Sequence, residues 1–277
     1  MKAPLHQLLV HLDDAAPAAV RLAYARKIAA RHEAALAAAY AVIPSMVEVP
    51  FAAEAGPQAL DALREIDVQR RAQAHAVFDA SQAPGDTASW CELSGFPLVS
   101  SFSEQALYAD LLVLGQHQPE GGPAGIPFDF VESVLLTAGK PALVVPYTAR
   151  ALELPQTLAI AWKPTREAAR AVAAALPLLQ QAREVHVLTW GEGATTPAGG
   201  LDLPAWLQRR GVEARWHREA EAEPDTVGDH FLSRACDLGA DLLVMGVYGH
   251  SRAREWVLGG ASRTVLQAMT VPVLVAH

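Results

Sequence analysis

Cysteine is nearly absent from this sequence, with only Cys91 and Cys236 among 277 residues. Two cysteines cannot form a disulfide framework, and their spacing is not that of metal ligands, so we interpret both as buried or idle thiols. Long apolar runs are also missing, because charged residues, glycine and proline interrupt the hydrophobic residues before a membrane-spanning length is reached. Residues 1–6 lead into a strand-like segment without the apolar core of a signal peptide. We therefore expect a cytoplasmic protein that does not interact with membranes.

Lysine and arginine are fewer than aspartate and glutamate, 22 against 30, which gives a formal net charge of −8. A general nucleic-acid surface requires clustered lysine and arginine, so we expect no nucleic-acid partner. Any anionic ligand needs a local binding site instead. The length, with 51% hydrophobic residues, suits one large domain or two of average size.

The sequence repeats itself. DLLVLG at 110–115 matches DLLVMG at 241–246, and each is followed, at the same separation, by a proline and a second apolar strand at 141–145 and 272–276. The apolar segments at 8–13 and 158–163 also match, and both precede alanine-rich helical patterns. These matches predict two domains, at 1–150 and 151–277.

Within each copy, short apolar runs alternate with helical patterns, which predicts a parallel sheet covered by helices on both faces. Thr165 is a candidate N-cap for a helix whose apolar face contains Ala168, Val172 and Leu179, while Glu167 is expected away from that face. A second helix should end at Gly239. The extra length of the first copy, at 44–80, contains a further predicted helix, and residues 119–127 are predicted to form a mobile loop.

A glycine-rich segment follows the predicted strand at 242–245. Gly246 and Gly249 permit tight turns and close approach of the backbone to a ligand, while Gly259 and Gly260 open a predicted helix. The free N–H groups at that helix start would face the crevice where α/β sheets bind ligands, which favours an anion. Glycines at a strand end are also common in plain turns, so both interpretations remain open.

The segment resembles the universal stress protein family, whose ATP-binding members carry Gly-x2-Gly-x9-Gly-[Ser/Thr]. Gly246, Gly249 and Gly259 match the three glycines, and Gly260 replaces the final hydroxyl residue. The resemblance covers nearly the whole chain twice. It implies two tandem Rossmann-like (adenine nucleotide α-hydrolase-like) domains, each with a five-stranded parallel sheet. It also implies ATP or AMP in the second copy, with adenosine across the first two strands and phosphates over the glycine segment.

Several positions modify what the resemblance implies. The family places an aspartate at the end of the first strand, where the second copy has Lys163, a group that only donates hydrogen bonds. Trp190 ends the next strand, where its indole either stacks on adenine or seals the strand. His250 and Arg252 either contact a phosphate or belong to a solvated basic loop. The candidate nucleotide-binding residues are Ala161, Lys163, Trp190, Gly246, Gly249, His250, Arg252, Gly259, Gly260, Ala261 and Ser262.

The first copy shows the reverse pattern. It retains Asp13, but Gly115 is followed by Gln116, and Asp129 stands where the second copy has Gly260. A carboxylate there would repel phosphate, so we expect this copy to be a structural partner that does not bind ATP in the family's manner. His11 and His117 could approach one another, but two histidines do not make a metal site, and we predict no metal.

These features support a non-catalytic protein that binds adenine nucleotide and responds to stress. A nucleotide-free scaffold or protein-interaction module with decayed sites is the alternative. An ATP-hydrolysing enzyme is disfavoured, because the sequence shows no Walker motif, magnesium-binding carboxylates or nucleophile motif. We expect the last strands of the two copies to pair in an intramolecular pseudo-dimer. A homodimer and an unidentified protein partner are also consistent with the family.

Overall fold

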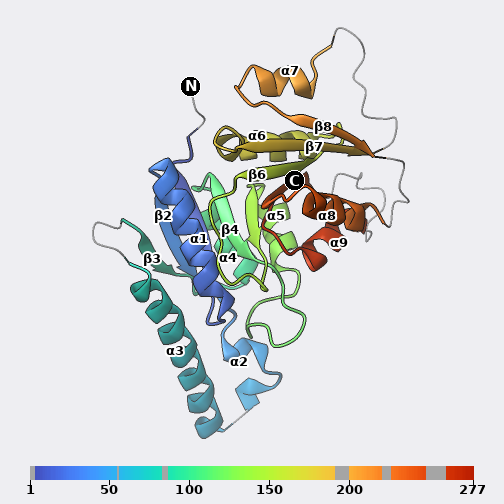
Figure 1. The fold of residues 1–277 in the computed structure, drawn as a ribbon. Helices are drawn as coiled ribbons and strands as arrows, with labels where there is room; N and C mark the ends of the chain where they lie inside the picture. Colours follow the sequence, from blue (N-terminus) through green and yellow to red (C-terminus); the bar gives the residue numbers. More distant parts are fainter. Residues whose placement is uncertain (1–3, 55, 83–86, 191–199, 220–225, 248–259) are drawn as a thin grey trace. The chain divides into compact units, whose positions relative to one another are not determined.

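The computed structural model describes residues 4–54, 56–82, 87–190, 200–219, 226–247 and 260–277 (Figure 1). The chain forms two compact units. The first comprises Leu5–Lys140 and Tyr147–Glu153, and the second comprises Pro141–Pro146 and Leu154–His277, with the start of the chain also assigned to it. The predicted domain limits, 1–150 and 151–277, remain a prediction, because this division assigns the strand after residue 140 to the second unit.

The first unit contains four parallel strands in the order β3-β2-β1-β4. The strands are β1 (Gln7–Leu12), β2 (Ala35–Tyr40), β3 (Ser89–Glu92) and β4 (Leu111–Gly115). The helices are α1 (Pro17–His32), α2 (Ser45–Glu48), the 3-10 helix η1 (Ala52–Glu54), α3 (Pro57–Ala80), α4 (Leu98–Ala106) and α5 (Phe130–Ala138). The helix predicted in the extra segment of the first copy is α3.

The second unit contains strands in the order β5-β10-β9-β6-β7-β8. They are β5 (Ala142–Val145), β6 (Thr157–Ala161), β7 (Glu184–Trp190), β8 (Arg215–Glu219), β9 (Leu242–Gly246) and β10 (Val273–Ala276). The helices are α6 (Arg166–Leu179), α7 (Leu203–Gln208), α8 (Val227–Asp237) and α9 (Gly260–Ala268). The pairs from β10 to β8 are parallel, whereas β5 pairs antiparallel with β10. The α/β class and the pairing of the two last strands therefore agree with the sequence.

Local signals explain where the helices of the second unit begin and end. The hydroxyl of Thr165 accepts a hydrogen bond from the backbone N–H of Ala168 and caps α6. Gly239 adopts a positive φ of 64° directly after α8, a conformation that suits glycine and ends the helix. One prediction was wrong: Glu167 is only 2% exposed and lies on the buried face of α6.

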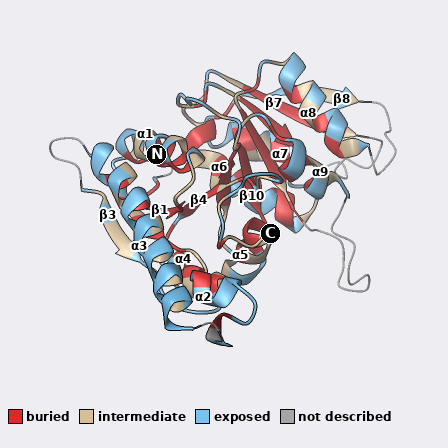
Figure 2. Cartoon of the chain, turned by 90° about the horizontal axis from the view of Figure 1, so that it is seen from below, coloured by how far each residue is buried: buried red, intermediate tan, exposed pale blue. Residues whose placement is uncertain are grey.

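Burial follows the sheet. The interior strands of both units are almost completely buried, whereas most of α3 is exposed (Figure 2). Only Ala74 and Phe78 of α3 are buried, and the Phe78 ring packs against Trp90 of β3. No helix in the described part of the chain combines the length and apolar character needed to cross a membrane.

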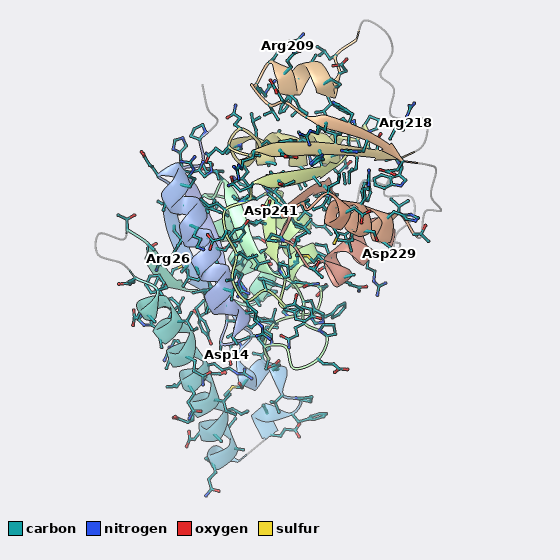
Figure 3. All side chains as sticks on the ribbon, viewed as in Figure 1. Asp14, Arg26, Arg209, Arg218, Asp229 and Asp241 are labelled. Atoms are coloured by element: carbon teal, nitrogen blue, oxygen red, sulfur yellow. The ribbon has the colours of Figure 1, made fainter. Side chains whose placement is uncertain are left out.

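The aspartate that starts each repeated strand has a structural role. Asp110 accepts hydrogen bonds from the backbone N–H groups of His6 and Gln7 at 2.7 and 3.0 Å. Asp241 accepts the equivalent pair from Gln156 and Thr157, at 2.8 and 3.0 Å (Figure 3 labels Asp241). Each aspartate thus satisfies the N–H groups that precede or open the first strand of its copy, which explains the repeated residue physically.

Candidate functional site

The expected ligand-binding crevice of the second unit is at the carboxyl ends of β6 and β9. Strand β6 lies between β7 and β9 and pairs parallel with both, so the connections after β6 and after β9 run in opposite directions along the sheet. Parallel α/β sheets bind ligands at such a switch point, outside the carboxyl ends of the strands. Ala161 is aligned with Met245, the residue before Gly246, and Lys163 follows two residues after the end of β6, so these three candidate residues lie at the same edge of the sheet.

Gly246 has a packing role that the sequence did not reveal. A Cβ atom built there would lie 2.5 Å from the carbonyl carbon of Glu167 and 2.8 Å from Cα of Ala168, both in the first turn of α6. Both obstacles are backbone atoms, which cannot rotate away. The glycine is therefore required for α6 to approach β9, whether or not a ligand binds nearby.

The other predicted residues occupy different environments. Ala161 is buried and aligned with Leu188 and Met245 in the neighbouring strands. Lys163 is exposed just beyond β6. Trp190 is half-buried at the end of β7, and its ring meets Phe231 of α8 edge-on, with centroids 4.1 Å apart. This contact supplies a packing role for the indole.

The helix predicted to follow the glycine segment is α9, which starts at Gly260. Gly260 is exposed, Ala261 is half-buried and Ser262 is 7% exposed. Gly249, His250, Arg252 and Gly259 lie outside the described residues. Their predicted roles, like those of the whole candidate set, remain predictions.

Glu167 is the residue that sequence reasoning missed. Burial alone would raise the pKa of its carboxyl, but hydrogen bonds from the Arg166 guanidinium and from its own backbone N–H hold the pKa below the usual value. An ionised carboxylate therefore belongs to the first turn of α6, whose backbone packs against Gly246. The signal was available in part, because acidic residues favour the positive end of the helix dipole.

At the corresponding strand ends of the first unit, a buried arginine and a buried aspartate interact with each other. Arg21 of α1 is only 3% exposed, and its guanidinium lies against Gly115 at the end of β4. It donates hydrogen bonds to the backbone oxygen of His11 at 2.7 Å and to the Asp13 carboxylate at 2.8 Å. Asp13 also accepts from the backbone N–H of Ala15 at 2.9 Å. Asp13 is therefore already engaged within the protein.

Burial and the Arg21 guanidinium determine the protonation states of Asp13 and His11. Burial opposes ionisation of Asp13, but the Arg21 guanidinium and then His11 outweigh it and lower the pKa of that carboxyl. Burial and Arg21 lower the pKa of His11 to about 4, so its ring is neutral near pH 7. His11 donates from Nε2 to the backbone oxygen of Ala41 at 2.8 Å, whereas His117 is exposed. Within the described ranges, no three His, Cys, Asp or Glu side chains are arranged to hold a metal ion.

Solved structures share this architecture over almost the entire chain. A universal stress protein from Archaeoglobus fulgidus superposes with a TM-score of 0.69 at 16% identity, over 98% of this chain and 95% of that chain. A putative universal stress protein from Pseudomonas aeruginosa gives 0.62 at 17% identity, over 98% and 93%. This chain has the universal stress protein fold. A functionally unknown protein from Pseudomonas aeruginosa also gives a TM-score of 0.62 at 17% identity, over 98% of this chain and 92% of that chain.

No protein-family profile matches the sequence, and no curated protein sequence matches it. At these identities the structural likeness establishes the fold, and it does not transfer a ligand. The function must therefore be argued from residues of this chain.

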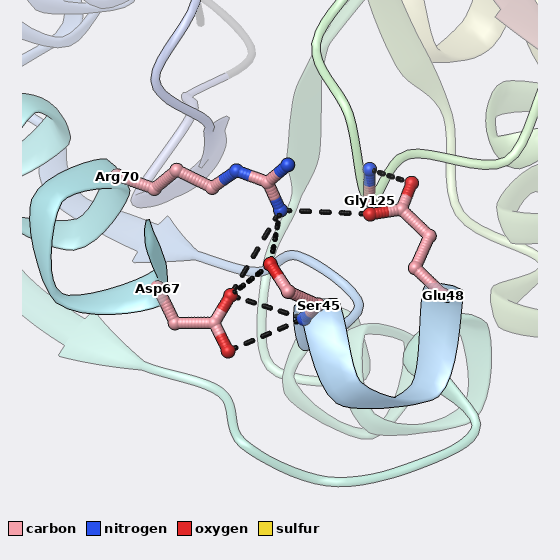
Figure 4. A network of polar contacts seen from close by, with 5 residues as sticks. All are labelled: Ser45, Glu48, Asp67, Arg70 and Gly125. Atoms are coloured by element: carbon pink, nitrogen blue, oxygen red, sulfur yellow. Dashed lines mark hydrogen bonds and ion pairs between the residues drawn. The ribbon is translucent and has the colours of Figure 1, made fainter. Parts of the chain in front are cut away.

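A polar network within the first copy of the universal stress protein fold anchors the loop at 119–127 (Figure 4). The Gly125 N–H donates to the Glu48 carboxylate at 2.6 Å, and the Gly125 carbonyl accepts from the backbone N–H of Ile43 at 2.8 Å. Arg70 of α3 donates to the hydroxyl of Ser45 at 3.1 Å and lies 3.5 Å from Glu48. The loop that the sequence predicted to be mobile is thus tied at Gly125 to the extra segment of this copy.

Proposed function

We propose that the second unit binds an adenine nucleotide, ATP or AMP, without catalysing its hydrolysis, and that binding is coupled to a stress response. The observation that carries this proposal is the difference between the two crevices. Arg21 and Asp13 form a buried ion pair in the first unit, whereas Ala171 and Lys163 stand at the repeat-related positions of the second. At these repeat-related positions, the second unit therefore has no counterpart of the buried Arg21 guanidinium.

The charge around the second crevice supports an anionic ligand. Lys163 is exposed at the end of β6, and the side chain of Arg166 is 71% exposed at the start of α6. Lys163 can attract phosphate groups, whereas the Arg166 guanidinium is already hydrogen-bonded to Glu167, whose carboxylate can only accept hydrogen bonds. We infer that phosphates lie toward Lys163 and α9, away from the Glu167 carboxylate.

A nucleotide-free scaffold or protein-interaction module is the second candidate. The edge-on contact of Trp190 with Phe231 favours it, because that contact already uses the indole. The tight packing of Gly246 on α6 also favours it, because this glycine is explained without a ligand. In either case we propose a cytoplasmic protein whose copies form an intramolecular pseudo-dimer through β5 and β10.

Calorimetry with ATP, AMP and adenosine tests the nucleotide proposal. We expect Lys163→Ala to weaken ATP binding about three- to tenfold and adenosine binding much less, because the ammonium group would act on phosphate. Arg183→Ala is the matched control, since Arg183 is an exposed cation before β7, at the opposite end of the parallel strands. Gly249→Val should abolish phosphate-dependent affinity.

The outcomes separate the two candidates. Absence of ATP, AMP and adenosine binding to the wild-type protein would contradict nucleotide binding and favour the scaffold. Binding that persists unchanged in Gly249→Val would reject the glycine segment as the phosphate site.

A further inference from the structure

Two histidines meet across the last two strands of the second unit. His186 of β7 is 3% exposed, and its Nδ1 lies 3.0 Å from Nε2 of the half-buried His217 in β8. Register places His186 opposite Arg215 and places His217 opposite Leu188, so the two rings share one face of the sheet. The ring centroids are 5.1 Å apart. Since β8 ends the strand order of the described residues, this contact joins an edge strand to the sheet.

The neighbouring charges select one arrangement of hydrogens. Nε2 of His186 is buried without a hydrogen bond and lies 3.5 Å from the carboxylate of Glu184, which itself accepts from Arg215 at 2.9 Å. A carboxylate repels an imidazole lone pair, so the hydrogen of neutral His186 belongs on Nε2. Nδ1 of His186 then accepts the hydrogen bond that Nε2–H of His217 donates.

This arrangement tolerates one proton but not two. A proton at Nδ1 of His217 would lie away from the contact and leave the hydrogen bond between the rings intact. The second proton must enter at Nδ1 of His186, the accepting atom. Two N–H groups and two positive charges would then face each other across 3.0 Å, with Arg215 adding a third charge nearby. Glu184 offsets only part of this repulsion, because it is already paired with Arg215.

From these contacts we propose that the His186–His217 pair is a proton-operated latch, which holds the edge strand β8 on β7 near neutral pH and releases it on acidification. At the other end of β8, Glu219 pairs with Arg234 of α8 at 2.8 Å, so that end remains held. Release therefore starts at Arg215 and His217.

The attachment of β8 depends on pH because the pKa of His186 differs between the attached and the detached strand. Burial, then the charge of His217, lowers the pKa of His186 below its ordinary value of 6.5. The unfolded or detached strand consequently binds more protons than the attached strand below that pH. The attachment of β8 is complete above about pH 6.5 and weakens as the pH falls.

Hydrogen exchange of the full-length protein tests the latch. After correction for intrinsic chemistry, amides of residues 215–219 should exchange about tenfold faster at pH 5 than at pH 7.5. His217→Gln retains a hydrogen-bonding side chain without a titrating ring, and should reduce this pH response, because His186 then faces no second imidazole. His230→Gln, at an exposed histidine of α8, should retain it. Exchange at β1, which contains the buried His11, separates the local effect from general acid destabilisation.

A pH-independent exchange rate at β8, or an unchanged response in His217→Gln, would overturn the proposal. If His217→Gln already loosens β8 at pH 7.5, NMR titration of the imidazole groups in the wild-type protein tests the latch instead. Two coupled titrations, one well below pH 6.5, support the latch, whereas two independent titrations near 6.5 reject it.

Discussion

Gly246→Ala is expected to destabilise the second unit by about 3 kcal/mol, although it adds a single methyl group. The added Cβ would lie 2.5 Å from the carbonyl carbon of Glu167, so the first turn of α6 must move away from β9. Urea unfolding followed by hydrogen-exchange mass spectrometry measures this loss, because it reports on each unit separately.

Gly56→Ser is the control for that experiment. Gly56 has nothing within 4 Å of an added Cβ, and it is the N-cap of α3, a position where serine is favourable. We expect a change within about 0.5 kcal/mol there. A cost below about 1 kcal/mol for Gly246→Ala would show that α6 shifts easily, contrary to the packing argument.

Arg21→Met is expected to destabilise the first unit by about 3 to 5 kcal/mol, because it leaves the Asp13 carboxylate buried without its cation. The pKa of Asp13 is lowered in the native protein, so the ion pair contributes stability above pH 4 and loses it as the pH falls through the native pKa. The difference between wild type and variant should therefore be largest near pH 7 and shrink below about pH 4. Urea unfolding at a series of pH values measures it.

Lys27→Met provides the contrast. Lys27 forms a 2.7 Å ion pair with Glu153, but the two side chains are 39% and 85% exposed, so its loss should cost less than about 1 kcal/mol. Adding Asp13→Asn to Arg21→Met should recover part of the lost stability, since it removes the uncompensated charge. Equal costs for Arg21→Met and Lys27→Met would contradict the assignment of Arg21 as a buried structural cation.

These effects determine which variants can probe ligand binding. Gly246→Ala damages packing whether or not nucleotide binds, so reduced affinity in that variant would not identify a phosphate site. Lys163 is a cleaner position because it is exposed and follows β6. A change there alters charge at the crevice without opening the core.

Much of the fold was predictable because short stretches of sequence determine where its helices and strands begin and end. Thr165 and Gly239 mark helix ends through backbone preferences that act over a few residues. The repeated strands were recognisable because both copies bury nearly continuous apolar runs. Glu167 escaped prediction because a charged residue one position from Arg166 resembles part of a solvated face, and only the packed structure shows that it is buried.

The candidate site was less predictable than the fold. Arg21 resembles a surface cation on an alanine-rich helix until α1 is placed beside the glycine that ends β4. His186 and His217 are 31 residues apart, and only the register of β7 with β8 brings their rings together. Such contacts depend on long-range pairing, which hydrophobic periodicity does not encode.

The sequence by itself determined the duplication, the α/β class and the glycine-rich segment, because these depend on composition and on preferences between near neighbours. Tertiary structure alone decided that Arg21 is buried at the strand ends of the first copy and that Gly246 serves packing. It also decided that two distant histidines share a hydrogen bond. The physical reason is that burial and electrostatic interaction depend on which distant backbones approach within a few ångströms, and that approach is settled when sheet and helices pack together.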